Sequence, residues 1–516
     1  GYYLKASNLF KRSLKIGDNK YWEAFCLYWY GRSEYEHNKF DAALDLFKQF
    51  DKHPNNKEVV SEYRLNYDIG YTYFKLGEYQ YALKSFEVFN KSNDVLDVSY
   101  QRDTFLRIAD CHFALKNYWA AMENYNIAIL LSPKNGAYAS FQKAVSYGFV
   151  DRNIQKIKAL IEFLKIYPKN DLLDDVLFEL ASAYSQEGED EEAIKTYDKL
   201  LSVFEKSPFL AKSSLNKGLI LYNLEKYELA KDVLEEVALN YIRYPVGEQA
   251  ISTLKEIAID QGGVSSFIEW TKDKGLNKFS DSEIEKTAFK SAERQFLDGN
   301  TDKSLKLLEE HLKAYPNGSF SKVVLYYLAE IYFDKEFFDK ALVAYKELIE
   351  DNVSSYTEKA LVRVIIILKN NDQQITAIPY MEKLAEVSSY KENKRFAILN
   401  LMQAYYSNEE HEKTLETIEK VLGLTELTEN IKIDALKFKA RSSLALLDSL
   451  KAGDTYKQLE NSSQTLIAAE AIYFRAELLN RKKAYFDSNK LISKIAENGG
   501  QAKKWNAKAL LLLAKN

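Results

Sequence analysis

The sequence predicts an all-α fold, a right-handed superhelix of about twelve helix-turn-helix repeats with half-repeats at both ends. Three observations lead to this prediction. Helix breakers are scarce, with 7 Pro and 19 Gly in 516 residues. Apolar residues recur at the three- and four-residue spacing of amphipathic helices. The pattern itself recurs about every 37 residues, which indicates stacked helix pairs rather than separate globular domains.

Composition narrows the class of protein. Hydrophobic residues make up 46% of the chain and charged residues 28%, so it can bury a large apolar core. The 71 basic and 75 acidic residues nearly balance, and we expect no nucleic-acid partner. The longest apolar runs, 509–514 and 364–368, are far shorter than the roughly 20 residues that span a bilayer.

One order of small and aromatic residues marks each repeat. Its clearest copy reads Gly70, Tyr73, Gly77, Tyr79, Ala82, Phe86. The position that introduces the second helix is occupied in turn by Phe40, Tyr79, Tyr118, Asn153, Asp190, Tyr227, Thr301, Phe338, Ile375, His411 and Tyr485. Successive steps are 35 to 39 residues, apart from two steps of 74. Because 74 is twice 37, we expect a divergent copy near residue 264 and another near residue 448.

Steric demands explain the small residues and the three Tyr-Pro pairs. Gly or Ala in the first helix and Ala early in the second let two helix axes approach to about 8–10 Å. Pro has no N–H to donate and disfavours helix in the residue before it. We therefore expect the pairs at 167–168, 244–245 and 315–316 to end second helices and turn the chain into the next repeat.

These residues resemble the tetratricopeptide repeat family, whose pattern of Leu-Gly, Tyr, Gly-x-Tyr, Ala, Phe or Tyr, Ala and Pro is closest to the copies at 68–89 and 107–133. The resemblance covers almost the whole chain, and two copies, at 246–272 and 430–460, diverge. It implies a non-catalytic scaffold for protein partners, working in a larger complex. Repeats that end in Tyr-Pro, above all 314–348, look like those of bacterial envelope assembly proteins.

That likeness implies a place in the periplasm or at the periplasmic face of the outer membrane, in an assembly or secretion complex. A cytoplasmic adaptor or regulator is the alternative. A third class, an enzyme whose catalytic domain lies outside this sequence, leaves no trace in it.

The pattern divides the chain into five segments. We expect the second helix of a truncated repeat at 1–18, an N-terminal array at 19–245, a degenerate repeat with a flexure at 246–283, a C-terminal array at 284–495, and the first helix of a truncated repeat at 496–516. The sequence therefore reads as a piece of a longer chain, or as one that continues into another subunit. An upstream lipoprotein or peripheral membrane attachment would fit the envelope interpretation.

Catalytic signatures are missing from the sequence. The five histidines are scattered, and at 411–415 Leu415 stands where a zinc-protease helix requires its second His. No phosphate-binding loop, dinucleotide fingerprint or nucleophile elbow occurs. Cys26 and Cys111 fall two repeats apart, beyond disulfide reach, and we expect buried thiols. We predict no catalytic residue, no cofactor and no metal.

The resemblance also implies a concave surface built by first helices. Its groove positions are Phe25, Tyr28, Arg32, Tyr35, Tyr67, Tyr71, Phe74, Lys75, Phe113, Phe141 and Phe149, with Phe178, Tyr222, Tyr326, Phe333 and Tyr406 in later copies. Aromatic side chains with polar tips supply contact area to a partner at low entropic cost. The Lys and Asn of the family's carboxylate clamp are absent, which disfavours chaperone-tail binding. Packing between repeats is the other interpretation of this stripe, and the sequence slightly favours it.

Overall fold

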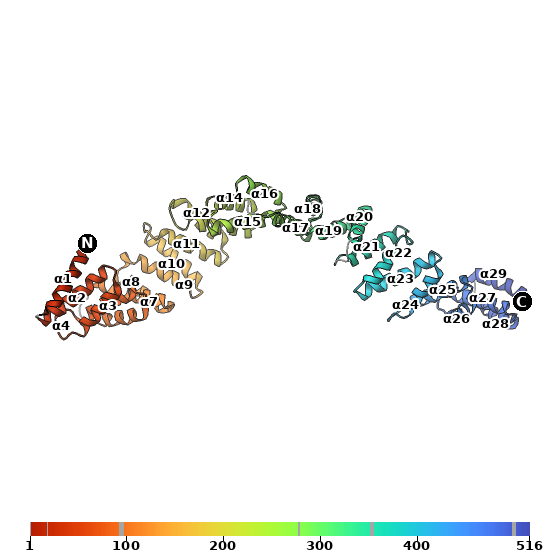
Figure 1. The fold of residues 1–516 in the computed structure, drawn as a ribbon, viewed down its shortest axis with the longest axis horizontal. Helices are drawn as coiled ribbons and strands as arrows, with labels where there is room; N and C mark the ends of the chain where they lie inside the picture. Colours follow the sequence, from red (N-terminus) through yellow and green to blue (C-terminus); the bar gives the residue numbers. More distant parts are fainter. Residues whose placement is uncertain (1, 18, 92–96, 277–278, 351–354, 498–501) are drawn as a thin grey trace. The chain divides into compact units, whose positions relative to one another are not determined.

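The computed structural model describes residues 2–17, 19–91, 97–276, 279–350, 355–497 and 502–516. Within these ranges the chain forms helices α1 to α29 and no strand (Figure 1). The predicted all-α class is therefore confirmed. The chain separates into two compact units, Gly1–Ile257 with Lys274–Leu276, and Ala258–Asp273 with Asn277–Asn516.

The first unit stacks helix pairs in chain order. Its pairs are α2/α3, α5/α6, α7/α8, α9/α10, α11/α12 and α13/α14, and each pair packs on the next. The helices are α1 (Tyr2–Ile16), α2 (Lys20–Glu36), α3 (Phe40–Asp51), α4 (Asn56–Val59), α5 (Glu62–Lys75), α6 (Tyr79–Asn90), α7 (Val98–Ala114), α8 (Tyr118–Leu131), α9 (Ala137–Gly148), α10 (Asn153–Ile166), α11 (Leu173–Gln186), α12 (Asp190–Val203), α13 (Leu210–Asn223) and α14 (Tyr227–Asn240).

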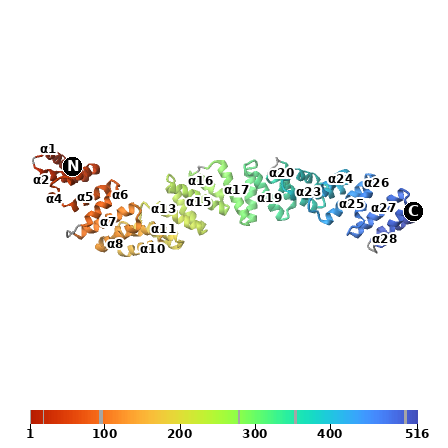
Figure 2. The same ribbon diagram turned by 90° about the horizontal axis from the view of Figure 1, so that it is seen from below.

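The second unit repeats this arrangement with the pairs α17/α18, α19/α20, α21/α22, α23/α24, α25/α26 and α27/α28 (Figure 2). Its helices are α16 (Val264–Asp273), α17 (Asp281–Leu297), α18 (Thr301–Ala314), α19 (Ser321–Asp334), α20 (Phe338–Glu350), α21 (Thr357–Asn370), α22 (Ile378–Val387), α23 (Lys391–Ser407), α24 (His411–Leu422), α25 (Glu429–Ala445), α26 (Ser449–Leu459), α27 (Thr465–Arg481), α28 (Tyr485–Glu497) and α29 (Lys503–Lys515). The boundary between the two units falls within α15 (Pro245–Gln261).

The predicted repeat positions match the observed helices closely. Ten of the eleven marked positions, all except Ile375, are the first residues of second helices. The divergent copies are also found, since α16 begins at Val264 and α26 at Ser449. At Ile375 the prediction is wrong by three residues, because α22 begins at Ile378 with Pro379 in its first turn. Pro fits there because the first-turn N–H groups have no partner within the helix.

Small residues let the helices of a pair meet, as the sequence predicted. A Cβ atom added to Gly31 would lie 2.8 Å from the Phe47 ring, and one added to Gly70 would lie 2.9 Å from Phe86. At Gly218 the same atom would lie 2.6 Å from Leu234. These distances are shorter than van der Waals contact, so α2, α5 and α13 need glycine where each crosses its second helix.

The Tyr-Pro pairs do not all act alike. Helices α10 and α18 end directly before Tyr167 and Tyr315, as predicted. At 244–245 the prediction is wrong, because α14 has already ended at Asn240 and Pro245 is the first residue of α15. Pro suits that position since its fixed φ is helical and its missing N–H would have had no partner.

Candidate binding surface

The first joint between repeats is built on a buried carboxylate. Tyr28 on α2 is 3% exposed, and its hydroxyl donates a 2.6 Å hydrogen bond to Oδ2 of Asp68 on α5. From the same helix, Arg32 Nη1 donates to the other oxygen of Asp68 at 2.7 Å. Two residues predicted for the groove therefore bind the next repeat of their own chain.

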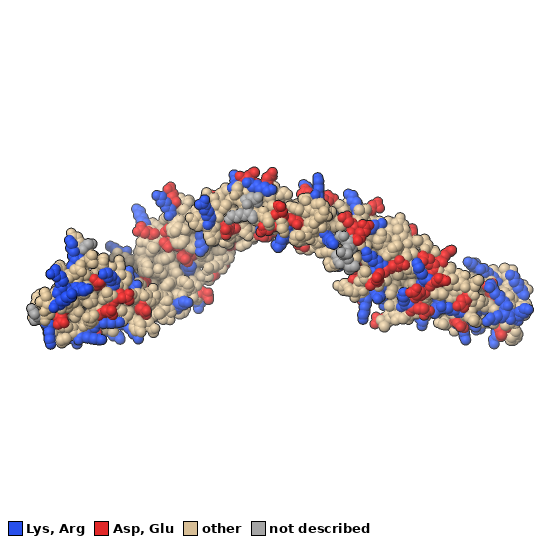
Figure 3. All heavy atoms as spheres, in the orientation of Figure 1, with Lys and Arg blue, Asp and Glu red and all other residues tan. Residues whose placement is uncertain are grey.

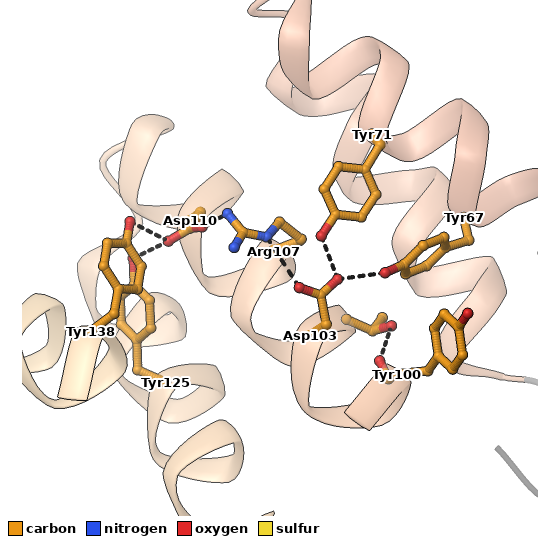
Figure 4. Close-up of polar contacts among 9 residues, drawn as sticks. Tyr67, Tyr71, Tyr100, Asp103, Arg107, Asp110, Tyr125 and Tyr138 are labelled. Atoms are coloured by element: carbon orange, nitrogen blue, oxygen red, sulfur yellow. Dashed lines mark hydrogen bonds and ion pairs between the residues drawn. The ribbon is translucent and has the colours of Figure 1, made fainter. Parts of the chain in front are cut away.

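The second joint repeats this chemistry one helix pair further on. Tyr67 on α5 donates to Oδ2 of Asp103 on α7 at 2.7 Å, and the Tyr71 hydroxyl donates to the same oxygen (Figure 4). Arg107 Nε lies 3.7 Å from the other oxygen of Asp103. The spacing from tyrosine to carboxylate is 40 residues at the first joint and 36 between Tyr67 and Asp103, about one repeat in each case.

Arg107 connects the second joint to a third. Its Nη1 donates to Oδ2 of Asp110 at 2.6 Å. The other oxygen of Asp110 accepts from Tyr125 on α8 at 2.7 Å and from Tyr138 on α9 at 3.2 Å (Figure 4). We call the residues of the three joints the tyrosine–aspartate ladder: Tyr28, Arg32, Tyr67, Asp68, Tyr71, Asp103, Arg107, Asp110, Tyr125 and Tyr138.

Burial controls the protonation of the ladder. Desolvation, aided by the charge of Asp68, raises the pKa of Tyr28 to about 12. Burial is also the main reason that the pKa of Tyr71 lies above its ordinary value, and hydrogen bonding to Asp103 adds to it. Burial raises the pKa of Tyr138 to about 12 as well, with a contribution from Asp110. The phenols therefore stay protonated near neutral pH and act as hydrogen-bond donors.

A hollow of about 250 Å³ opens beside the first joint. The Arg32 and Arg64 side chains at its border are 28% and 33% exposed. The Arg64 guanidinium lies 5.2 Å from the ring centroid of Tyr67 and 5.0 Å from that of Tyr100. The hollow is bordered by Arg32, Tyr35, Phe47, Arg64, Tyr67, Asp68, Tyr71 and Tyr100. The Arg64 guanidinium lies over two aromatic rings, and that of Arg32 is bonded to the buried Asp68. The N–H groups that both arginines leave exposed suit an incoming anionic group.

The structure thus brings five predicted groove residues, Tyr28, Arg32, Tyr35, Tyr67 and Tyr71, to one place. The other predicted residues of the first unit lie apart from it. Phe25 packs between Trp22 and Trp29, and Phe74 and Phe113 contact the tyrosines that begin the next helices. Phe149 is 56% exposed and stacks on Tyr118. Phe141 is buried, and Lys75 is exposed.

Predicted residues of later copies are also engaged with neighbouring side chains. Phe178 is buried and stacks on Phe209, and Tyr326 stacks on Tyr356. The Arg363 guanidinium lies 4.2 Å from the ring centroid of Phe333, and Tyr406 packs on Phe438. Tyr222 is half-buried. Whether any residue of the stripe binds a partner stays a prediction.

Sequence reasoning missed the acceptors and the second arginine of the hollow. Asp68, Asp103 and Arg64 were not predicted from the sequence. Asp68 lies one repeat beyond Tyr28, and Asp103 lies one repeat beyond Tyr67. Arg64 borders the hollow together with Tyr67. A search for Tyr followed about 36 to 40 residues later by Asp would have found the pairs. Trp22 and Trp29, 57% and 41% exposed beside Phe25, were also missed.

In the second unit, pairs of glutamate and arginine side chains join one first helix to the next. Glu330 on α19 accepts from Arg363 on α21 at 2.8 Å and from Tyr345 on α20 at 2.5 Å. Glu470 on α27 accepts two hydrogen bonds from Arg441 on α25, at 2.7 and 2.6 Å. Such bidentate pairs fix two first helices relative to each other.

Other reactive groups are buried or isolated. Cys26 and Cys111 are buried free thiols, and burial raises the pKa of Cys111 to about 12. In the part of the chain that the structure describes, no three His, Cys, Asp or Glu side chains are grouped as a metal site would require. None of the described helices combines the length and apolarity needed to cross a membrane.

Comparison with known repeats agrees with this architecture. One model of the tetratricopeptide repeat matches residues 25–56 and 175–207, and a second model of that repeat matches residues 211–238. The chain contains tetratricopeptide repeats. The first matched segment includes Tyr28 and Arg32, so the ladder begins within a recognised tetratricopeptide repeat.

No curated protein sequence matches the chain. Among solved structures, MamA is 22% identical over 33% of this chain and 92% of its own, with a TM-score of 0.28. YrrB, described as a tetratricopeptide repeat protein with an unusual peptide-binding site, is 16% identical over 37% of this chain and 91% of its own, with a TM-score of 0.30. The Naa15/Naa10 structure with HypK is 14% identical over 99% of this chain and 77% of that chain, with a TM-score of 0.35.

Proposed function

We propose that the chain is a non-catalytic scaffold that binds a partner protein on its first helices, at the hollow beside the first joint. The observation that carries the proposal is the pair of partly exposed guanidinium groups at this hollow, those of Arg32 and of Arg64, the latter held over Tyr67 and Tyr100. Arginine and tyrosine are the residue types that most often dominate binding energy in protein interfaces. A carboxylate of the partner would bind the exposed N–H groups of these arginines.

The ladder and the hollow divide the predicted stripe into two roles. The Tyr28 hydroxyl donates to Asp68, and the hydroxyls of Tyr67 and Tyr71 donate to Asp103. These three tyrosines therefore hold successive repeats in register. Tyr35 borders the hollow, is half-buried and packs edge-on against Phe40, which leaves part of it open to a partner. Arg64 reaches the hollow from α5.

We place the scaffold in a bacterial periplasm or at the periplasmic face of the outer membrane, as one component of an assembly or secretion complex. The support is the likeness of the Tyr-Pro repeats to those of envelope assembly proteins. The alternative is a cytoplasmic adaptor or regulator. Fractionation of the native cells separates the two, because recovery in the cytosolic fraction alone contradicts the envelope proposal.

The experiment that tests the function is capture of partners from native membranes, followed by mass spectrometry. Arg64→Gln and Tyr35→Ala should lose a partner that the unchanged chain captures, with little change in melting temperature. Tyr28→Phe is the matched control, since it should lower the melting temperature and keep the partner at temperatures where the chain is folded. Retention of every partner by the Arg64 and Tyr35 variants would contradict the proposed binding surface.

A further inference from the structure

Lysines on three first helices bond back to the second helix of the preceding repeat. Each lysine amine contacts the same position of that second helix, eight residues after the helix begins. In two repeats the partner is a carboxylate, 2.5 Å from Lys217 and 2.6 Å from Lys439. In the third repeat Lys143 donates at 2.8 Å to an amide oxygen, which carries no charge. The partners at the shared position are Asp198 on α12, Glu419 on α24 and Asn126 on α8.

The surroundings of Lys143 are poor in charge. It is the only charged residue of α9, and the only charged residue of α8 is Glu123. Figure 3 shows that the visible face over α9 and α10 is mostly uncharged. Lys143 is half-buried, and burial lowers its pKa from the ordinary 10.5, while the charge of Glu162 on α10 opposes the shift. More of this amine is therefore uncharged at neutral pH than in an ordinary lysine.

The Lys143 side chain borders a hollow of about 380 Å³ between α8, α9 and α10. Ile129, Ala159 and Phe163 supply apolar parts of its wall. The other titratable residues on the wall are Tyr147, Lys158, Glu162 and Tyr167. The volume lies within the range of small-molecule sites, about 300–1,000 Å³. The hollow can therefore admit a small reactant to the lysine amine, and the positive charge of Lys158 suits an anionic one.

We propose that Lys143 is a site of covalent acylation, at which a small activated acyl donor such as an acyl phosphate reacts with the lysine amine in this hollow. A lysine amine is nucleophilic only when uncharged, and partial desolvation without a carboxylate partner favours that form. The site shares no residue with the hollow beside the first joint, so the proposal does not depend on the binding surface proposed above.

The reaction needs only the lysine, the donor and water. The lone pair of Nζ forms a bond to the carbonyl carbon of the acyl phosphate, and the bond from that carbon to the phosphate oxygen breaks. Phosphate leaves with the bonding electrons, and the nitrogen loses one proton to water. The products are an uncharged amide at Lys143 and inorganic phosphate. The amide keeps one N–H group, which can still donate to Asn126.

Acetyl phosphate is the probe for the test. The full chain is incubated with it at pH 7.5, and acetylation of each lysine is followed by peptide mass spectrometry. We expect Lys143 to react at least about fivefold faster than the carboxylate-bonded Lys217 and the exposed Lys134, because more of its amine is uncharged. All three lysines are measured in the same sample, so they share one donor concentration.

Two matched substitutions exchange the partners of Lys143 and Lys217. Asn126→Asp gives Lys143 the carboxylate that the other repeats have, and should slow its acetylation to about the rate of Lys217. Asp198→Asn gives Lys217 an amide partner and should speed its acetylation. Both changes nearly preserve side-chain size, and circular dichroism checks the fold. Unfolding would expose every lysine, so it cannot produce a selective loss at Lys143.

Three results would overturn the proposal. The first is acetylation of Lys143 no faster than that of Lys134. The second is an unchanged rate at Lys143 in the Asn126→Asp variant, because the missing carboxylate would then not be the cause. The third is a preference for Lys143 with acetyl phosphate that disappears with an uncharged donor, N-hydroxysuccinimidyl acetate, because the hollow would then bind phosphate without making the amine reactive.

Discussion

The hydroxyl of Tyr28 donates a 2.6 Å hydrogen bond to Asp68, 40 residues further along the chain and one repeat away. This bond joins two first helices that are not neighbours in sequence. Arg32 adds a second bond to the same carboxylate, so the interface between repeats is polar as well as apolar. Because a repeat cannot bury its apolar face alone, such interface bonds contribute directly to the stability of the stack.

Removing the Tyr28 hydroxyl should therefore weaken the first joint. We expect Tyr28→Phe to lower the free energy of unfolding by about 1–3 kcal/mol, because Asp68 loses a buried donor. Tyr28→Ala should cost about 3–5 kcal/mol, since it also leaves a cavity. Chemical denaturation followed by circular dichroism measures both. Tyr2→Phe, at a tyrosine that is 89% exposed, is the control and should change nothing measurable.

The glycines of the first helices should resist even the smallest substitution. Ala favours helix over Gly by about 1 kcal/mol. At Gly31 and Gly218 we expect the opposite result, a loss of about 1–3 kcal/mol, because the new methyl group meets Phe47 or Leu234 at less than contact distance. Gly453→Ala is the matched control: its nearest neighbour, Leu478, would lie 3.4 Å away, and the variant should be as stable as the unchanged chain or more so. Equal melting temperatures for the Gly31, Gly218 and Gly453 variants would contradict this explanation.

High pH should break the hydrogen bonds of the tyrosine–aspartate ladder, because ionised tyrosines cannot donate them. The pKa of Tyr28 is raised to about 12 from an ordinary value of 10.0. A group whose pKa is higher in the folded state contributes stability that is fully present below pH 10 and is lost as the pH rises toward 12. Ultraviolet titration should thus show the ladder tyrosines ionising only together with loss of helical circular dichroism. Tyr28→Phe should make the loss of stability between those pH values less steep.

Low pH should act on the second unit through His311. This side chain is 2% exposed and lies beside the rings of Phe289 and Tyr315. Burial lowers its pKa from the ordinary 6.5, while the charge of Glu285 and a hydrogen bond with the backbone of Glu285 oppose the shift. Its contribution to stability is therefore present above pH 6.5 and declines as the pH falls, by at most about 1.4 kcal/mol per pH unit.

We expect the melting temperature to fall less between pH 7 and pH 5 in His311→Leu than in the unchanged chain. His37 is exposed, and His37→Leu should leave the pH dependence unaltered. An identical pH profile for the unchanged chain and the His311 variant would contradict the assignment.

The sequence predicted the period of the repeats better than it predicted the side-chain contacts between successive repeats. The recurring small and aromatic residues located second helices as divergent as those beginning at Val264 and Ser449, because steric demands at a helix crossing repeat with every unit. The wrong prediction at Tyr244 and Pro245 came from local geometry and not from the period. This pair precedes and begins α15 instead of ending α14, and the dipeptide alone does not distinguish the two positions.

The candidate site was only half predictable. Tyr28, Tyr67 and Tyr71 stood out because aromatic residues recur at groove positions, but the partners Asp68 and Asp103 are ordinary acidic residues in the sequence. Their role depends on stacking, which brings together side chains 36 to 40 residues apart. The same stacking explains why tyrosines expected to face a partner bind their own chain.

The most direct test of the central claim is a double-mutant cycle on Tyr28 and Asp68, using Tyr28→Phe, Asp68→Asn and the double variant. The free energy of opening should be measured by native-state hydrogen exchange at amides of α2 and α5, because a repeat protein does not unfold in one step. We predict a coupling energy of about 1–3 kcal/mol at amides of both helices. Additive effects, with no coupling across the joint, would contradict the claim that these side chains hold one repeat to the next.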